Sequence, residues 1–261
     1  MILLTGTYGF IGRHFKHALH GRHVICVEED YCFRFLDQWD GWEKVDLIIH
    51  NGAITSTTET DVQKIHKYNV DFTVRLMEKA IRYQIPIKYA SSASVYGQFG
   101  NETVSPQSQY ALSKLQVDYF VRDNIDRFKS VQGFRYFNVY GSGEEHKGDQ
   151  ASPVSKFQWQ AEDGGPIILF ENSNHYLRDF VWVGDVVDVV LNNKRGSGVF
   201  DLGTGEPISF ERVAGYIADK YGVGVKHVPM PGNIRTQYQS WTCAWDEWED
   251  KKFMTVGEYL K

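Results

Sequence analysis

Short apolar runs alternate with longer segments of helical periodicity through the first half of the chain. The apolar runs have the length of buried strands, and this alternation is typical of βαβ units that build a parallel sheet. The segment 61–84 carries apolar residues three to four positions apart, which predicts a helix with an apolar stripe against the sheet. These residues are Ile65, Tyr68, Phe72, Leu76 and Ala80. The predicted strands are residues 1–5, 23–28, 45–50, 86–91 and 131–137.

A second helix is predicted from Tyr110 to about Arg127. The stretch 29–43 is short and irregular, so we expect one crossover to be reduced to a loop. After Gly148 the elements become shorter, which predicts a smaller second lobe. Its expected elements are helices at 153–163 and 209–222, strands at 166–171 and 198–203, and a mixed segment at 178–193.

Composition narrows the functional classes. The chain has 261 residues, of which 42% are hydrophobic and 15% aromatic, enough for one large α/β domain or a main domain with a lobe. A net charge of -5 provides no basic face, so we expect no nucleic-acid partner, no membrane partner and a small-molecule ligand. Cys26, Cys32 and Cys243 form no CxxC pair, as a reduced compartment permits. The chain opens on strand-like residues without a secretion signal, so we expect a cytoplasmic enzyme.

A glycine-rich loop follows the first predicted strand. The sequence "LLTGTYGFIGRHF" places Gly6, Gly9 and Gly12 between that strand and a helix that opens with Phe10 and Ile11. Such glycines let the backbone approach a pyrophosphate at the helix N-terminus, which predicts a dinucleotide site. The spacing is GxxGxxG rather than the commoner GxGxxG, and a tight structural turn is the alternative explanation.

The identity of the dinucleotide depends on residues near the second strand. Glu28 ends that strand about 20 residues after the first glycine, where a carboxylate binds the adenosine ribose hydroxyls and favours NAD. Arg13 and Arg34 offer charge for a 2′-phosphate, so NADP stays open. Together the pattern and the loop predict a Rossmann-like, doubly wound α/β fold. We expect a NAD(P)-binding domain at 1–148 and a mainly substrate-binding lobe at 149–261, with some segments returning to the first domain.

A tyrosine and a lysine stand four residues apart in "YALSK". Tyr110 and Lys114 therefore share one helix face, where an ammonium stabilises a phenolate whose ordinary pKa is about 10. Ser92, at the end of the fourth predicted strand, can hydrogen-bond the same substrate oxygen. Taken singly, each residue also fits a packed tyrosine, a solvated lysine or a capping serine.

The glycine loop, the strand-end serine and YxxxK, in this order, resemble the extended short-chain dehydrogenase/reductase family, whose members modify nucleotide sugars. The resemblance covers nearly the whole chain and implies that Ser92, Tyr110 and Lys114 are the catalytic triad, with Lys114 also holding the nicotinamide ribose. It also implies cofactor contacts from the loop 50–53 through Ala53 and from Tyr136.

The same resemblance assigns residues to the substrate. It implies that Asn138 and Arg178 contact the substrate diphosphate. Arginine suits phosphate because its planar fork donates in pairs, although an ion pair with Asp179 or Asp185 is the ordinary alternative. Tyr238 in "YQSWT" completes the implied substrate-binding set.

Several longer segments are most similar to the subgroup of this family that epimerises carbon 6 of ADP-glycero-manno-heptose. They are "GAITSTTETD", "GFRYFNVYG", "EEHKGDQAS", "RDFVWVGDV" and "FDLGTGEPISF". That subgroup implies oxidation to a ketone, turning of the ketone and hydride return to its other face, with a cofactor that stays bound. It also implies that Lys147 is a second acid/base, with phosphate contact or solvation as alternatives. Gln237 replaces an expected arginine, and the chain is shorter than the subgroup, which leaves the substrate open.

Three alternatives follow from these residues. A 4,6-dehydratase needs an acidic pair after the strand-end hydroxyl, whereas Ala93 and Ser94 stand there. A UDP-sugar 4-epimerase, or another nucleotide-sugar oxidoreductase, shares the triad and remains the main enzymatic alternative. A catalytically idle NAD(P)-binding regulatory protein would have no need of the triad.

Two remaining features predict no further chemistry. His146 has no second ligand at useful spacing, so we expect no metal. Trp241, Trp245 and Trp248 recur at helical spacing, which favours core packing or a subunit contact, and we expect a homo-oligomer.

Overall fold

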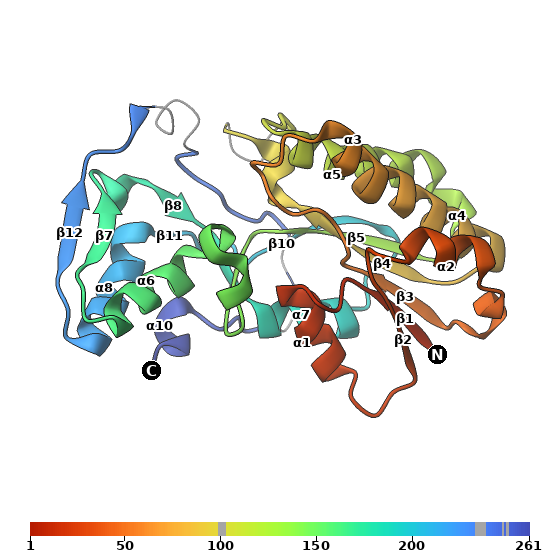
Figure 1. Ribbon diagram of the computed structural model, residues 1–261, viewed down its shortest axis with the longest axis horizontal. Coiled ribbons are helices and arrows are strands. Elements are labelled where there is room, and N and C mark those ends of the chain that lie inside the picture. The colour runs from red at the N-terminus through yellow and green to blue at the C-terminus, as the bar shows by residue number, and fades with distance from the viewer. Residues whose placement is uncertain (99–102, 233–238, 247, 249–250) are drawn as a thin grey trace. The chain divides into compact units, whose positions relative to one another are not determined.

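The computed structural model describes residues 1–98, 103–232, 239–246, 248 and 251–261. Its main feature is a six-stranded sheet in the order β10-β5-β4-β3-β1-β2 (Figure 1). Ile2 of β1 pairs in parallel with Val24 of β2 on one side and Leu47 of β3 on the other. The strands are β1 Ile2–Thr5, β2 Val24–Val27, β3 Leu47–His50, β4 Ile87–Ser92, β5 Val131–Tyr136 and β10 Gly198–Leu202. All five strands predicted in the first half are confirmed, as is the Rossmann-like fold class.

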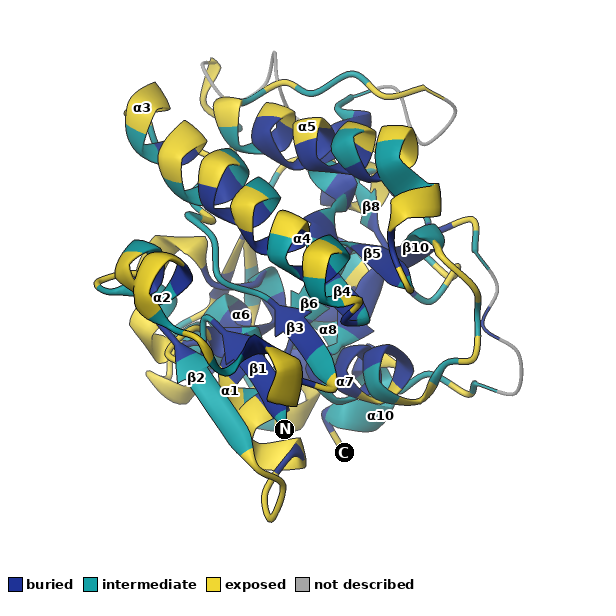
Figure 2. Cartoon of the chain, turned by 90° about the vertical axis from the view of Figure 1, so that its right-hand side faces the viewer, coloured by how far each residue is buried: buried dark blue, intermediate teal, exposed yellow. Residues whose placement is uncertain are grey.

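Helices cover both faces of this sheet. In Figure 1, α3, α4 and α5 lie over one face, with α1 and α7 on the other. Figure 2 shows exposed residues on the outer sides of α4 and α5 and buried residues on the sides toward the sheet. The helices are α1 Phe10–Ala18, α3 Val62–Ile65, α4 Phe72–Tyr83, α5 Gln109–Asn124 and α7 Val183–Asn192, and a π-helical turn, His66–Asp71, joins α3 to α4.

The apolar stripe predicted for residues 61–84 is buried. Ile65, Phe72, Leu76 and Ala80 are all at most 4% exposed, whereas Tyr68 is only partly buried and packs against the core that contains Phe72, Leu76 and Ala80. Helix α4 ends at Gln84, whose φ of 53° lies in the left-handed region that stops a helix. The helix predicted from Tyr110 begins one residue earlier, where Ser108 Oγ accepts from the Ala111 amide at 3.1 Å.

The expected loop at 29–43 is wrong. This stretch forms α2, Cys32–Gln38, followed by a short 3₁₀ helix at Gly41–Lys44. The reason is tertiary packing: Leu36 and Trp42 are each 1% exposed, and Phe35 and Trp39 stack at 4.8 Å between ring centroids. Burial of these side chains stabilises a segment whose sequence is too irregular to predict a helix on its own.

The chain divides into two units. The first contains residues 1–95, 106–135 and 187–200, and the second contains 96–105, 136–186 and 201–261. The second segment of the first unit ends at Arg135, and the third segment, 187–200, returns to the sheet late in the sequence. The reason is that the edge strand β10 pairs with β5 after the chain has passed through residues 136–186 of the second unit.

The second unit is built from short pairs of strands and two main helices. Helix α6 begins behind a Ser152 cap and packs with α8 and β7 around a core that includes Phe157, Val213 and Ile217. The pairs are β6 with β9 and β7 with β12, both parallel, and β8 with β11, antiparallel. The elements are β6 Asn138–Tyr140, α6 Pro153–Glu162, β7 Ile167–Phe170, β8 Leu177–Arg178, β9 Phe180–Trp182, β11 Ile208–Ser209, α8 Phe210–Tyr221, β12 Val225–Val228 and α10 Val256–Tyr259.

The tryptophan segment is not helical where it is described. Residues 239–246 have no regular secondary structure, and Trp245 is 62% exposed. Trp248 is buried, and its Nε1 donates to the Asp201 carbonyl at 3.1 Å. Of the three tryptophans, Trp248 is therefore the one that packs in the interior, because a segment without helical structure does not repeat its side chains on one face. No described helix is long and apolar enough to cross a bilayer.

Candidate active site

The glycine loop joins β1 to α1, and its backbone leaves no space for a side chain at Gly6 or Gly12. A Cβ on Gly12 would lie 1.9 Å from the Gly6 carbonyl oxygen, and one on Gly6 would lie 2.6 Å from Gly52 Cα. Gly6 also has a φ of +73°, which favours glycine. The loop leads into α1 at Gly9, where backbone amides face outward at the positive end of the helix dipole. This close-packed cradle fits the pyrophosphate of a dinucleotide.

The first residues of α1 contribute backbone rather than side chains to this cradle. Phe10 is 5% exposed, and its ring packs edge-on against His14 at 5.5 Å. Ile11 is half-buried. Their amide groups belong to the helix N-terminus and are the part of each residue that suits a phosphate.

Glu28 lies against the glycine loop. Its Oε1 accepts from the Thr7 amide at 2.9 Å and also from the Thr7 hydroxyl, and the side chain is buried. Arg13 and Arg34, the two candidates for a 2′-phosphate, are exposed. Glu28 thus fixes the shape of the loop at the end of β2, the position where a carboxylate meets ribose hydroxyls in this fold.

A series of buried hydrogen bonds holds the loop after β3. Thr5 Oγ1 lies 2.7 Å from His50 Nδ1 and accepts from the Gly52 amide at 2.9 Å, while His50 Nε2 lies 2.8 Å from Thr73 Oγ1. Burial lowers the pKa of His50 to about 3, so this imidazole is neutral. Ala53 follows in the same loop and is half-buried. His50 therefore acts as a structural tie between β1, β3 and α4.

Ser92 and Tyr110 meet at the end of β4. Their side chains are hydrogen-bonded, and Ser92 Oγ also accepts from the Ser94 hydroxyl at 2.9 Å. Burial raises the pKa of Tyr110, and the bond with Ser92 opposes that shift because it favours the phenolate. The pair thus joins two hydroxyl groups, an arrangement that suits proton exchange with a third oxygen.

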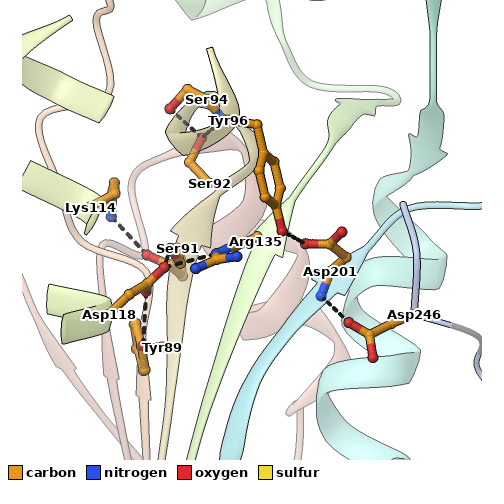
Figure 3. Close-up of polar contacts among 11 residues, drawn as sticks. Tyr89, Ser91, Ser92, Ser94, Tyr96, Lys114, Asp118, Arg135, Asp201 and Asp246 are labelled. Atoms are coloured by element: carbon orange, nitrogen blue, oxygen red, sulfur yellow. Dashed lines mark hydrogen bonds and ion pairs between the residues drawn. The ribbon is translucent and has the colours of Figure 1, made fainter. Parts of the chain in front are cut away.

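Lys114 completes this group one helical turn after Tyr110. Its Nζ donates to the Ala90 carbonyl at 2.8 Å, the dashed line from Lys114 in Figure 3. The same Nζ lies 5.9 Å from the centroid of the Tyr110 ring. Burial lowers the pKa of Lys114 to about 8, and Asp118 opposes the shift. Ser92, Tyr110 and Lys114 are therefore brought together by β4 and α5, as the sequence predicts.

Asn69 is a site residue that sequence reasoning missed. It is 1% exposed in the π-helical turn, where its amide bonds both the backbone of Ile54 and the Ser113 hydroxyl at 3.0 Å. Ser113 precedes Lys114, so Asn69 ties the loop after β3 to α5. The available signal was a polar residue four positions after Ile65, on the stripe that faces the sheet.

The residues expected at the substrate lie mainly in the second unit. Tyr136, the last residue of β5, is buried, and burial raises its pKa. Asn138 opens β6. Arg178 is 7% exposed, and its guanidinium donates to the Leu177 carbonyl at 2.9 Å and to the Gln239 carbonyl at 2.6 Å. Tyr238 and Gln237 lie outside the described residues.

Lys147 is held by a buried carboxylate. Its Nζ donates to Glu144 at 2.8 Å, and the Glu144 side chain has no exposed surface. Glu144 also accepts from the Ser152 amide at 2.8 Å, the Ser152 hydroxyl at 2.6 Å and the Ser155 hydroxyl at 2.8 Å. Glu144 therefore holds the Lys147 ammonium in place, although the lysine side chain is still 26% exposed.

Comparison with known proteins places this geometry in a family. Residues 2–196 match the model of the NAD dependent epimerase/dehydratase family, which is well over half of the chain. The structure is similar to ADP-L-glycero-D-manno-heptose-6-epimerase of Helicobacter pylori, with 26% identity and a TM-score of 0.84 over 99% of this chain and 93% of that one.

Two further solved structures share the fold. The enzyme MoeE5, solved with UDP-glucose and NAD, is 25% identical with a TM-score of 0.74 over 94% of this chain and 89% of that one. UDP-glucose 4-epimerase of Thermotoga maritima is 21% identical with a TM-score of 0.83 over 99% and 96% of the two chains. The resemblance to extended short-chain dehydrogenases/reductases is thereby confirmed, and the chain is an NAD-dependent enzyme of the NAD dependent epimerase/dehydratase family.

Proposed function

We propose that this enzyme epimerises a nucleotide sugar through a transient ketone, and that its substrate is an ADP-glycero-manno-heptose that reacts at carbon 6. The observation that carries the reaction class is the hydrogen bond between Ser92 and Tyr110 with Lys114 beside it. The heptose is supported by the likeness to the Helicobacter pylori enzyme over 99% of this chain and by the segment around Lys147.

The residues of the first unit take the proton from the sugar hydroxyl. A bound NAD would supply both the hydride acceptor and the hydride donor, so the reaction would have no net redox change. Tyr110 receives the hydroxyl proton as the carbon–oxygen bond becomes a carbonyl, and Ser92 holds the same oxygen. The Lys114 ammonium stabilises the phenolate and can donate to the ribose of the cofactor. The glycine cradle at Gly6 and Gly12 and the carboxylate of Glu28 hold the dinucleotide.

Lys147 is proposed as the second acid. A ketone that has turned presents its oxygen away from Tyr110, so its reduction needs a proton from another group. Lys147 suits this task because Glu144 holds its Nζ at 2.8 Å and leaves the side chain partly exposed. Asn138, Arg178 and Tyr238 are proposed to hold the substrate diphosphate and sugar, with Tyr136 beside the nicotinamide.

The proposal is tested with the purified enzyme and no added cofactor. ADP-D-glycero-D-manno-heptose is added, and the configuration at carbon 6 is followed by NMR. Conversion to the L-glycero epimer is expected, and it would also indicate that the nicotinamide is retained and recycled. The matched negative control is Tyr110→Phe.

A UDP-sugar 4-epimerase is the second candidate, since UDP-glucose 4-epimerase of Thermotoga maritima shares the fold over 99% of this chain. Absence of heptose turnover after NAD is supplied, together with conversion of UDP-glucose to UDP-galactose, would replace the heptose assignment with this one. Absence of turnover with any sugar nucleotide, with NAD still bound, would favour a regulatory protein.

A further inference from the structure

A buried carboxylate lies on α5 one turn beyond Lys114. Asp118 is 3% exposed, and three donors surround it (Figure 3). It accepts from the Tyr89 hydroxyl at 2.9 Å, from the Ser91 hydroxyl at 3.0 Å and from Arg135 Nε at 2.9 Å. Neither the glycine loop nor the proposed triad includes this group, so the free-energy cost of burying its carboxylate requires another explanation.

Three elements build the surroundings of Asp118. Tyr89 and Ser91 stand two apart on β4, and Gly133 and Arg135 stand two apart on the neighbouring β5, so each pair faces the same side of the sheet as α5. A Cβ on Gly133 would lie 2.3 Å from the Tyr89 ring. Tyr89 therefore reaches Asp118 only because the adjacent position on β5 carries no side chain.

The donors around Asp118 favour its charged form. Burial raises the pKa of this carboxyl, whereas Arg135, Ser91 and Tyr89 each lower it. Tyr89 is itself a neutral donor, because burial and the nearby carboxylate raise its pKa well above the ordinary value. Three hydrogen bonds to one carboxylate leave it an anion fixed in place.

Lys114 faces this anion from the same helix. The groups acting on its ammonium are Asp118 one turn along α5, the Tyr110 ring at 5.9 Å, the Ala90 carbonyl at 2.8 Å and the neutral imidazole of His50 on β3. Burial disfavours the ammonium, and of these groups Asp118 is the one whose negative charge restores it.

We propose that Asp118 is a positioning residue, the buried counterion that keeps Lys114 charged beside Tyr110. Asp118 points toward Tyr89, Ser91 and Arg135 (Figure 3). It therefore acts on Tyr110 through the charge of Lys114 and not by direct contact. The inference rests on the catalytic role proposed above for Tyr110 and Lys114.

The test titrates Lys114 directly and needs no substrate. Protein carrying ¹³C-labelled lysine is followed by NMR from pH 6 to 10, and the Lys114 signal is identified by its absence in Lys114→Met. In Asp118→Asn the midpoint of the Lys114 titration should fall by about one pH unit, because a nearby opposite charge is lost. Tyr89→Phe is the matched control: it removes one hydrogen bond but keeps the carboxylate, so the midpoint should move much less.

A second variant guards against misfolding. Asp118→Asn leaves the partly buried Arg135 without this carboxylate, whereas the double change Asp118→Asn/Arg135→Gln removes both charges. The same downward shift is expected in the double variant. With a nucleotide sugar that the enzyme turns over, the alkaline limb of the kcat profile should move down in step.

The outcomes separate the two proposals. An unchanged Lys114 midpoint in a folded Asp118 variant would overturn the counterion role, even if that variant lost activity through instability. A shifted midpoint together with full activity of Tyr110→Phe would support the counterion and instead remove the proposed catalytic mechanism.

Discussion

Tyr110 occupies an environment that disfavours its own ionisation. Burial raises the pKa of this phenol, and within the first unit the bond from Ser92 is the contact that lowers it. A buried tyrosine of this kind holds its proton tightly until an additional positive charge arrives nearby. The residue is thus suited to act once the site is loaded, which limits unproductive proton exchange in the empty enzyme.

Replacing Tyr110 with phenylalanine should abolish turnover while leaving the fold intact. Loss of a general acid/base lowers the rate by about 10²–10⁴-fold. Affinity for NADH, measured by fluorescence titration, should change little, because the hydroxyl contributes to proton transfer more than to binding. Tyr119→Phe, on the exposed side of the same helix, is the control and should keep wild-type activity. Full activity of Tyr110→Phe would contradict the mechanism.

At the scale of elements, the glycine loop is defined by contacts that admit no methyl group. A Cβ on Gly12 would meet the Gly6 carbonyl oxygen at 1.9 Å, and this oxygen belongs to backbone that cannot rotate away. The connection between β1 and α1 therefore depends on glycine for packing as well as for cofactor approach.

Gly12→Ala should weaken both folding and cofactor binding. Overpacking of this kind typically lowers the free energy of unfolding by about 1–3 kcal/mol. Gly215→Ala provides the contrast, because Gly215 lies inside α8 with open space around it and alanine is favoured there by about 0.5–1 kcal/mol. Urea unfolding and NADH titration of both variants check the prediction. Normal NADH affinity in Gly12→Ala would argue against the cradle.

The 3₁₀ segment at Glu145–Gln150 is fixed by the preceding residue, Glu144, whose buried carboxylate accepts from Lys147 Nζ. Its carboxylate joins Lys147 to the cap of α6 through Ser152 and Ser155. This one buried group thus fixes the longer loop 141–151, which contains three glycines, Gly141, Gly143 and Gly148.

Glu144→Gln should destabilise this segment, whereas the exposed neighbour Glu145→Gln should not. The amide would no longer offer a charged acceptor to the buried Ser152 and Ser155 hydroxyls and to Lys147. This loss should lower the free energy of unfolding by about 1–3 kcal/mol. The Glu145 change should stay within about 0.5 kcal/mol. Urea unfolding monitored by circular dichroism measures both. Equal effects of the two substitutions would show that Glu144 is not an anchor.

At the scale of the whole molecule, His50 links stability to pH. Its pKa is about 3 when folded, against about 6.5 when unfolded, because burial disfavours the imidazolium. Between these two pKa values, His50 is therefore protonated in the unfolded chain and neutral in the folded chain. Stability from this residue is complete above pH 6.5 and is lost as pH falls from 6.5 toward 3.

Acidification should therefore destabilise the wild type more than a variant without this imidazole. Between pH 7 and pH 5 the wild type should lose about 2 kcal/mol more unfolding free energy than His50→Gln. The exposed His146→Gln should follow the wild type, since this side chain lies on the surface and its removal leaves the buried His50 unchanged. Denaturant unfolding at the two pH values makes the comparison. A His50→Gln protein as acid-sensitive as the wild type would refute the assignment.

Local periodicity and motif order were sufficient for much of the architecture and for the centre of the candidate site. The five strands of the first half and the stripe from Ile65 to Ala80 follow from burial patterns that repeat over short distances. Ser92, Tyr110 and Lys114 were recognisable because a strand end and a helix of fixed pitch bring them together.

Tertiary contacts decided what short-range patterns do not encode. Helix α2 forms because Leu36 and Trp42 find a core to fill, although the sequence suggested a loop. The return of residues 187–200 to the first unit depends on a strand pairing with β5 far back in the chain. Asn69, Asp118 and Glu144 gain their roles from partners on other elements, and a buried polar residue in a single sequence does not reveal its partners. The sequence thus determined most of the elements and the candidate groups Ser92, Tyr110 and Lys114, whereas only the packing of distant segments determined which buried polar groups lie around them.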